Sequence, residues 1–175
     1  MKNTIQLPVV TPKGVFLAHY SEQGLVELNF PDGGNHHASR LTREGETQRR
    51  PALPAPMLQW HQTTTEALHA VLAGRAAKAL PPLDWTGKTE FQQSVWRELL
   101  KLGPGNTRSY GEIAAAIGRP KAVRAVGGAC GANPIPVLVP CHRVLAANKK
   151  LGGFSGGLDW KRRLLGREGC VMRNA

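Results

Sequence analysis

One short segment constrains the fold of this chain more than any other. Ile135-Pro136-Val137-Leu138-Val139 is an uninterrupted apolar run. Such a run is stable only in the interior of a folded domain, so we expect a buried strand here. The run ends at Pro140-Cys141-His142-Arg143, where a thiol, an imidazole and a guanidinium follow one another. The sequence therefore predicts a buried strand that leads directly to reactive side chains.

The charge of the chain is distributed unevenly. Its 175 residues carry 23 Lys and Arg against 12 Asp and Glu, a formal net charge of +11. Residues 1–88 hold nine basic and seven acidic side chains, whereas residues 89–175 hold 14 and five. Because the surplus lies in one half, it indicates a nucleic-acid partner rather than a general aid to solubility.

The cysteines and the N-terminus favour the cytoplasm. Cys130, Cys141 and Cys170 are too few for a disulfide framework, and their spacing matches no zinc finger or ribbon. Residues 1–6 lack the apolar core of a signal peptide, and no stretch reaches 18 uninterrupted apolar residues. We therefore expect reduced thiols, a cytoplasmic location and no membrane anchor.

Residues 1–80 read as a small α/β domain. Val15–Tyr20 and Leu25–Phe30 are short apolar segments joined by a polar link, which predicts a β-hairpin. Apolar residues recur at helical spacing over Met57–Leu80, where two prolines end the predicted helix. The intervening segment Pro31–Pro56 shows no periodicity and predicts an irregular, mobile connection.

After a linker at 81–88, residues 89–175 read as a mostly α-helical domain. Thr89–Gln92 is a capping box that opens a helix, which Gly103-Pro104-Gly105 breaks. Ser109–Glu112 is a second capping box.

The second capping box opens a short helix that stops at Gly118. Pro120 suits the first turn of a following helix that runs to about Gly131. Two short helices with a tight turn have the proportions of a helix-turn-helix, although an ordinary αα-corner has them too. Lys121 and Arg124 on the second helix favour DNA binding. A last basic helix is expected from Asp159 to Glu168, after a segment with four glycines (152–157).

Cys141 has the surroundings of a nucleophile. His142 can supply a base, and Arg143 adds positive charge that would favour the reactive thiolate. Neighbours on an extended strand point to opposite faces, so a direct Cys141–His142 hydrogen bond needs a turn or a bridging water. Cys130 and Cys170 lack such neighbours and are better explained as inert packing.

Pro140-Cys141-His142-Arg143-Val144 resembles the active-site signature of the O6-alkylguanine-DNA alkyltransferases. The resemblance extends to Asn133–Pro136 before it and Ser155–Gly157 after it, and runs through essentially all of residues 85–170. It implies an α/β N-terminal domain of ribonuclease H-like type and a C-terminal domain that binds DNA through a helix-turn-helix. It also implies a monomer that flips an alkylated guanine from duplex DNA.

The resemblance implies a role for each site residue. Cys141 would accept the alkyl group irreversibly, in a single turnover and without a cofactor. His142 would relay the thiol proton through a water, Glu168 would orient His142, and Asn133 would pin the turn. The groups expected to bind the flipped base are Tyr110, the Val144 carbonyl, Ser155 and Phe154.

The same resemblance implies a DNA contact through the helix around Arg124. Arg124 would fill the gap left by the flipped base, and the helix would lie in the minor groove. Lys121, Ala125 and Gly127 would contact the DNA beside it.

Two departures from the family pattern affect these expectations. Phe154 stands where many members have Tyr, so a hydroxyl near the base is missing. Members that bind zinc in the first domain use Cys and His there, but residues 1–80 contain no cysteine. We therefore expect no metal, and interpret His36 and His37 as loop residues.

Two other readings remain. The chain could be a DNA-binding regulator without chemistry, with Cys141 in its core, or a cysteine hydrolase that turns over repeatedly. The sequence leaves open the preferred alkyl size and whether O4-alkylthymine is also a substrate.

Overall fold

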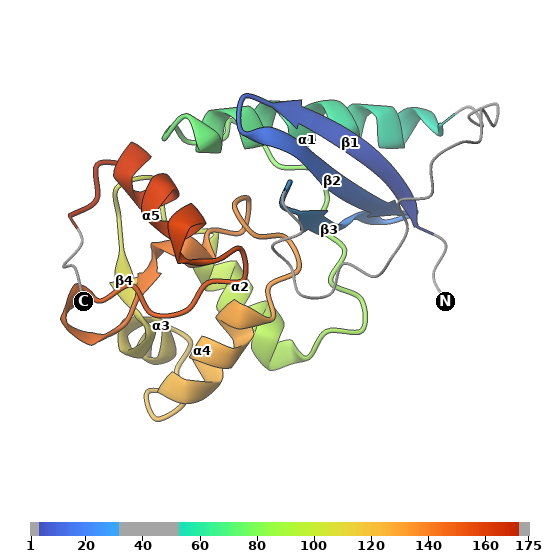
Figure 1. Ribbon diagram of the computed structural model, residues 1–175. Helices are drawn as coiled ribbons and strands as arrows, with labels where there is room; N and C mark the ends of the chain where they lie inside the picture. Colours follow the sequence, from blue (N-terminus) through green and yellow to red (C-terminus); the bar gives the residue numbers. More distant parts are fainter. Residues whose placement is uncertain (1–3, 32–52, 172–175) are drawn as a thin grey trace.

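The computed structural model describes residues 4–31 and 53–171 (Figure 1). Three antiparallel strands form a sheet in the order β1-β2-β3, and α1 lies along it. The remaining helices gather at one side of this sheet (Figure 1). The strands of the sheet are β1 (Ile5–Thr11), β2 (Gly14–Ser21) and β3 (Gly24–Asn29), and the helices are α1 (Ala55–Leu72), α2 (Glu90–Leu99), α3 (Tyr110–Ala116), α4 (Val123–Gly131) and α5 (Leu158–Arg167).

The predicted hairpin is confirmed as β2 and β3, which are joined by a two-residue turn. β1, which pairs with β2 along its whole length, was not predicted. Leu7 and Val9 alternate with exposed residues, a period-two signal that predicts a half-buried strand. Pro8 lies within β1, where a proline is tolerated because β1 is an edge strand.

The helix predicted over Met57–Leu80 is shorter than expected, because α1 ends at Leu72. Gly74 adopts φ +76°, and the N–H of Arg75 donates to the carbonyl of Ala70 at 2.9 Å. A side chain at position 74 would stand 2.2 Å from the carbonyl oxygen of Arg167. Only glycine lets α1 end against α5, so this residue and not the later prolines stops the helix.

The segment 81–88 is hydrogen-bonded to the sheet. The N–H of Leu25 donates to the carbonyl of Pro82 at 2.8 Å, and the N–H of Asp84 donates to the carbonyl of Leu25 at 2.9 Å. The Ser21 hydroxyl donates to the Asp84 carboxylate at 2.6 Å. These bonds fix the path of the chain from the sheet to α2.

Both predicted capping boxes are confirmed. Thr89 and Gln92 exchange hydrogen bonds at the start of α2, as Ser109 and Glu112 do at the start of α3. The helix expected to begin at Pro120 begins instead at Val123. Residues 119–122 form a turn in which the N–H of Ala122 donates to the carbonyl of Arg119 at 2.9 Å, so Pro120 supplies its fixed φ to a turn rather than to a helix.

The apolar run is buried as predicted, but it is not a strand. Ile135, Val137 and Val139 are inaccessible to solvent, while the chain turns and Val137 adopts φ +74°. The N–H of Val139 donates to the carbonyl of Ile135 at 2.9 Å, which closes the turn. Prolines at 134, 136 and 140 supply no N–H, so a strand here could not complete a ladder.

A short parallel pair, β4 (Arg108–Ser109) with β5 (Val144–Leu145), was not predicted. It holds the start of α3 beside the residues that follow Cys141. The last helix is confirmed as α5, with Glu168 at its C-cap and Gly169 at φ +72°. Most of the predicted connection 31–56, with His36 and His37, lies outside the described residues. Within the described ranges, no helix has the length and hydropathy needed to cross a membrane.

Candidate active site

A pocket of about 580 Å³ opens beside Cys141. Six of the residues predicted from the sequence line it together, although they come from separate parts of the chain. These six are Tyr110, Arg124, Gly127, Cys141, Phe154 and Ser155; Val123, Cys130, Gly131 and Gly153 complete the lining.

Cys141 opens a 3-10 turn (Cys141–Arg143) and is only 4% exposed. The side-chain amide of Asn133 donates to its Sγ at 3.1 Å and to the carbonyl of Val139 at 2.8 Å. The amide oxygen of Asn133 accepts from the N–H of Ile135 at 3.1 Å. One buried side chain thus holds the irregular turn closed and supplies a donor to the thiol.

His142 and Glu168 form a buried pair behind Cys141. Nε2 of His142 lies 3.0 Å from Oε1 of Glu168, and both side chains are inaccessible to solvent. Burial raises the pKa of Glu168, but hydrogen bonds from His142 and Arg143 outweigh it and lower that pKa to about 2. Because the carboxylate is ionised, Nε2 is the protonated nitrogen of a neutral imidazole.

The other nitrogen of His142, Nδ1, therefore carries the free lone pair. Nδ1 is buried and has no hydrogen-bond partner among the described residues. Burial lowers the pKa of His142, and the bond to Glu168 opposes this shift. A neutral imidazole whose free lone pair lies next in sequence to the cysteine can accept the thiol proton.

Arg143 does not play the part expected of it. Its guanidinium binds Glu168 through Nε at 3.0 and 3.1 Å and through Nη2 at 2.7 Å. Nη1 donates to the carbonyl of Leu102. The cation is thus committed to Glu168, and it orients that carboxylate toward His142 instead of acting on the thiol.

Lys161 is a cation whose charge opposes the rise in the pKa of Cys141, and it was not predicted from the sequence. It is fully buried on α5, and its Nζ donates to the carbonyls of Val144 at 2.7 Å and Gly153 at 3.3 Å. Burial lowers the pKa of Lys161 to about 8, against the opposing effect of the two nearby thiols. Its position three and four residues before Leu164 and Leu165 places Lys161 on the apolar face of the helix, and this spacing could have predicted a buried lysine.

The ionisation of the pocket follows from burial. Burial raises the pKa of Cys141, while the Asn133 amide and the Lys161 ammonium oppose the rise. Burial, together with the thiols Cys130 and Cys141, raises the pKa of Tyr110 to about 12. The free pocket therefore holds a protonated thiol and a phenol that remains a hydrogen-bond donor.

The pocket walls come from α3 and the glycine-rich segment. The Tyr110 hydroxyl lies so close to Gly152 that a Cβ there would stand 3.0 Å away. Phe154 meets His142 edge to face, with ring centroids 6.4 Å apart. Ser155 Oγ is buried without a hydrogen-bond partner among the described residues.

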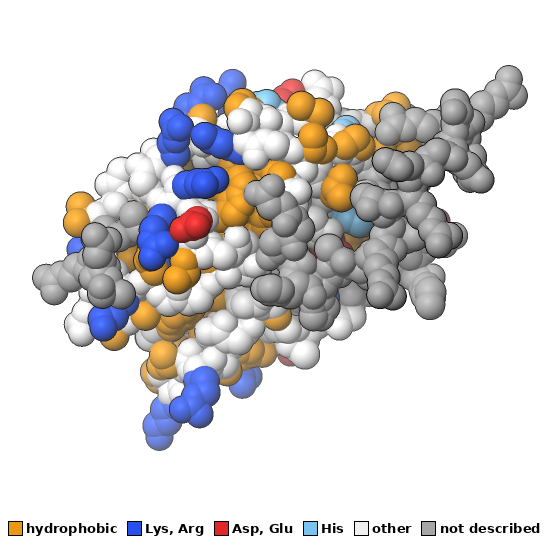
Figure 2. Space-filling model, viewed as in Figure 1, with side chains coloured by type: hydrophobic (Ala, Val, Ile, Leu, Met, Phe, Trp, Pro, Cys, Tyr) orange, Lys and Arg blue, Asp and Glu red, His pale blue; other side chains and the backbone are white. Residues whose placement is uncertain are grey.

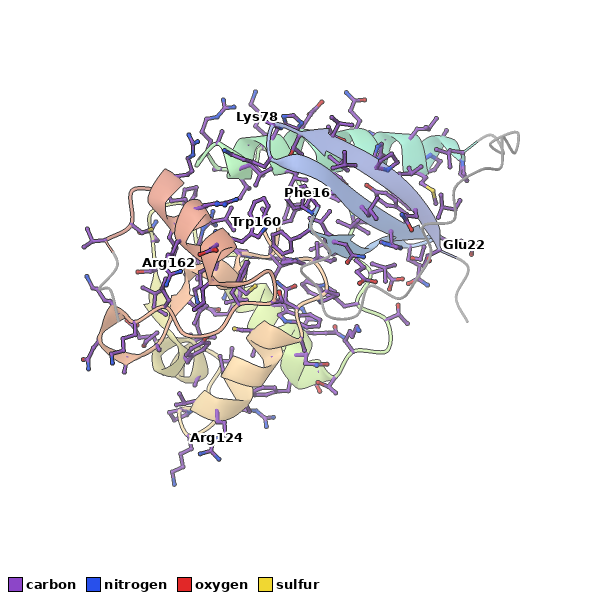
Figure 3. The ribbon with its side chains drawn as sticks, viewed as in Figure 1. Phe16, Glu22, Lys78, Arg124, Trp160 and Arg162 are labelled. Carbon is purple, nitrogen blue, oxygen red and sulfur yellow. The ribbon has the colours of Figure 1, made fainter. Side chains whose placement is uncertain are left out.

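The exposed side of α4 forms the rim of the pocket. Arg124, exposed at the lower end of the molecule in Figure 3, and Gly127 contribute to the lining. Lys121 and Ala125 are exposed but do not line the pocket. Val144 contributes its carbonyl to Lys161, and its side chain is buried.

Comparison with known proteins decides the family. The profile described as "6-O-methylguanine DNA methyltransferase, DNA binding domain" matches residues 90–170. The methylated-DNA–protein-cysteine methyltransferase of Methanosarcina acetivorans is 41% identical over 162 residues, which cover 91% of this chain and 94% of that protein. The chain belongs to the methylated-DNA–protein-cysteine methyltransferase family. The resemblance seen around Cys141 is thereby confirmed.

Other members of this methyltransferase family match parts or most of the chain. The Mycobacterium tuberculosis protein of the same name is 53% identical over 100 residues, or 57% of this chain, and that match spans 60% of its own length. The crystal structure of M. tuberculosis OGT in complex with DNA superposes with a TM-score of 0.68 and 39% identity, over 92% of this chain and 90% of that one.

Proposed function

We propose that this chain repairs alkylated DNA by transferring the alkyl group of O6-alkylguanine to Sγ of its own Cys141. The bond between O6 and the alkyl carbon breaks, a sulfur–carbon bond forms, and the thiol proton ends on the released guanine. The arrangement of Cys141, Asn133 and the His142–Glu168 pair beside a pocket supports this proposal most directly. Because a thioether is stable, each chain acts once.

The proton transfer uses the groups behind the cysteine. Nδ1 of His142 takes the thiol proton through a water, and the ionised Glu168 stabilises the resulting imidazolium. The Asn133 amide and the Lys161 ammonium stabilise the thiolate. The thiol stays protonated in the free pocket, so the reactive thiolate forms only when the proton passes to His142.

The alkylated base occupies the pocket. Tyr110 donates to the base and helps the leaving guanine become neutral, and its pKa of about 12 keeps it protonated. Ser155, whose buried hydroxyl has no partner among the described residues, and the Val144 carbonyl bind the base edges. Phe154 forms an apolar wall in place of the tyrosine of many relatives.

DNA binds on the α4 side of the pocket. α3 and α4 act as a helix-turn-helix whose second helix lies in the minor groove, and Lys121, Ala125 and Gly127 contact the backbone there. Arg124 fills the gap in the base stack, which recovers part of the few kcal/mol that unstacking costs. The crystal structure of M. tuberculosis OGT in complex with DNA supports DNA as the partner.

The proposal includes an organisation for the whole chain. Residues 1–80 form an N-terminal α/β domain of ribonuclease H-like type, 81–88 a linker, and 89–175 the DNA-binding and alkyl-acceptor domain. The protein acts as a monomer in the cytoplasm.

Transfer of a labelled methyl group from a duplex with O6-methylguanine tests this function. The intact chain and Cys130→Ser should both take up label, because the raised pKa of Cys130, about 12, keeps that thiol unreactive. Cys141→Ser should take up none and should still bind the duplex. Uptake by Cys141→Ser, or none by the intact chain, would refute the proposal.

A further inference from the structure

A second hollow lies on the outer side of α5, away from the Cys141 pocket. Its volume is about 380 Å³. It lies between the β1–β2 turn, the end of α1 and α5, and we call it the α5 groove. Its lining consists of Lys13, Leu72, Trp160, Arg162, Arg163, Leu164, Gly166 and Arg167.

The α5 groove is strongly basic. Four of its eight lining residues are cationic and none is acidic, and all four cations are exposed. Figure 2 shows Lys and Arg side chains gathered over α5 and the neighbouring end of α1. Of these four cations, only Arg162 forms an ion pair within the described residues. Its guanidinium lies 3.1 Å from the carboxylate of Asp159, and both side chains are at least half exposed. Such an exposed pair is weak and salt-screened.

The backbone around the groove is fixed by close contacts. Gly74, after α1, packs against the carbonyl of Arg167 at the end of α5. In the β1–β2 turn, the N–H of Lys13 donates to Thr11 Oγ1 at 3.1 Å. Trp160, Leu72 and Leu164 form an apolar floor. The cations therefore project from a preformed hollow rather than from independent loops.

The floor adds a feature that suits nucleic acid. The guanidinium of Arg163 lies 5.8 Å from the centre of the Trp160 ring, a distance at which cation and ring attract. Guanidinium groups bind phosphate oxygens with two parallel hydrogen bonds.

The groove and the Cys141 pocket lie on different sides of α5. Lys161 points inward to the carbonyls that border the pocket, while Arg163 lies two residues on, roughly 200° around the helix axis. Figure 3 shows Arg124 at the lower end of the molecule, away from Arg162 on α5. A duplex seated on α4 therefore leaves the groove available.

We propose that the α5 groove binds the phosphate backbone of a second DNA segment while the first occupies the pocket side. The proposal rests on the proposed function, since it assumes a protein that works on DNA. Non-specific phosphate contacts of this kind are weak and strongly salt-dependent. Their effect is to hold the protein near DNA while α4 releases one segment and engages another.

Stoichiometry at DNA excess tests the proposal. The intact protein is mixed at low salt with an undamaged duplex of roughly 15 base pairs, about one and a half turns. Native mass spectrometry should show one chain with two duplexes. Lys13→Ala/Arg167→Ala should reduce the population of this complex at least tenfold and keep the one-to-one complex. Lys88→Ala/Arg97→Ala removes the same charges elsewhere and should keep both complexes.

Three results would overturn the proposal. One is a one-to-one complex alone at every DNA excess, and another is a two-duplex complex that Lys13→Ala/Arg167→Ala leaves intact. The third is binding of inorganic phosphate to the groove without binding of a second duplex, which would make the groove an anion site of another kind. Thermal melting checks that both variants fold. Because the duplex is undamaged, failure of alkyl transfer to Cys141 is recorded separately.

Discussion

Nε2 of His142 lies 3.0 Å from Oε1 of Glu168, and neither side chain is accessible to solvent. This contact decides which nitrogen of the imidazole can act as a base. It also connects the turn that begins at Cys141 to Glu168, the C-cap residue of α5, which lies 27 positions after Cys141 in the chain. The chemistry at Cys141 therefore depends on how α5 packs.

Glu168→Gln tests that dependence. Loss of the carboxylate removes the group that opposes the burial-induced fall in the pKa of His142. His142 becomes a weaker base, so thiolate formation requires a higher pH. We expect single-turnover transfer to slow about tenfold near neutral pH and to recover at higher pH. A rate series against pH measures this.

Glu112→Gln is the control for that series. Glu112 belongs to the capping box of α3 and does not contact His142. Its substitution should lower stability slightly and leave the pH profile unchanged. Superimposable profiles for Glu168→Gln and the intact chain would exclude Glu168 from the proton relay.

Asn133→Ala should destabilise the protein and slow transfer. It leaves the buried N–H of Ile135 without its partner, a loss that costs about 1–3 kcal/mol. It also removes one of the two donors to the carbonyl of Val139, which keeps the N–H of Cys141. Urea unfolding measures the stability. Asn106→Ala removes an exposed amide with a single 3.5 Å hydrogen bond and should change neither the stability nor the rate of transfer. An unchanged unfolding midpoint for Asn133→Ala would show that the turn closes without it.

Lys161→Met should raise the pKa of the Cys141 thiol, because the ammonium that opposes the effect of burial is lost. The rate of alkylation by iodoacetamide against pH measures that pKa. Arg162→Met, the neighbouring cation on the exposed side of α5, should leave the profile in place. Equal shifts for the two variants would mean that the overall charge of α5, and not the buried Lys161, acts on the thiol.

Gly156→Ala should slow transfer by displacing the neighbouring Phe154 and Ser155, which line the pocket. A Cβ at this position would stand 2.5 Å from the ring of Phe30, which is held between Phe16 and Trp160. Phe30→Leu in the same chain removes the clash and should restore part of the rate. Gly153→Ala meets no atom within 4 Å and serves as the control. Equal losses for both alanine variants would contradict this account of the contact.

The helices with local signals could be predicted from the sequence. Each capping box needs only residues three positions apart, so Thr89–Gln92 and Ser109–Glu112 were recognised correctly. The end of α1 was not, because Gly74 acts through its contact with Arg167, a residue 93 positions away. Long-range contacts of this kind leave no local pattern.

The candidate site likewise has some residues with local sequence signals and others that depend on long-range contacts. Cys141, His142 and Tyr110 could be named as candidates because they stand in recognisable motifs. The buried Lys161 and the commitment of Arg143 to Glu168 were missed, because each depends on what lies across the fold. The apolar run shows the limit of pattern reasoning, since its burial was predicted correctly and its backbone, closed by Asn133, was not.

The most direct test of the central claim is the mass of the intact chain after incubation with excess O6-methylguanine duplex. We expect each chain to gain one methyl group and no more, peptide mapping to place it on Cys141, and one O6-methylguanine to be restored to guanine in the DNA per modified chain. Restoration of many guanines per chain, or a methyl group on Cys130 or Cys170, would contradict the proposed reaction.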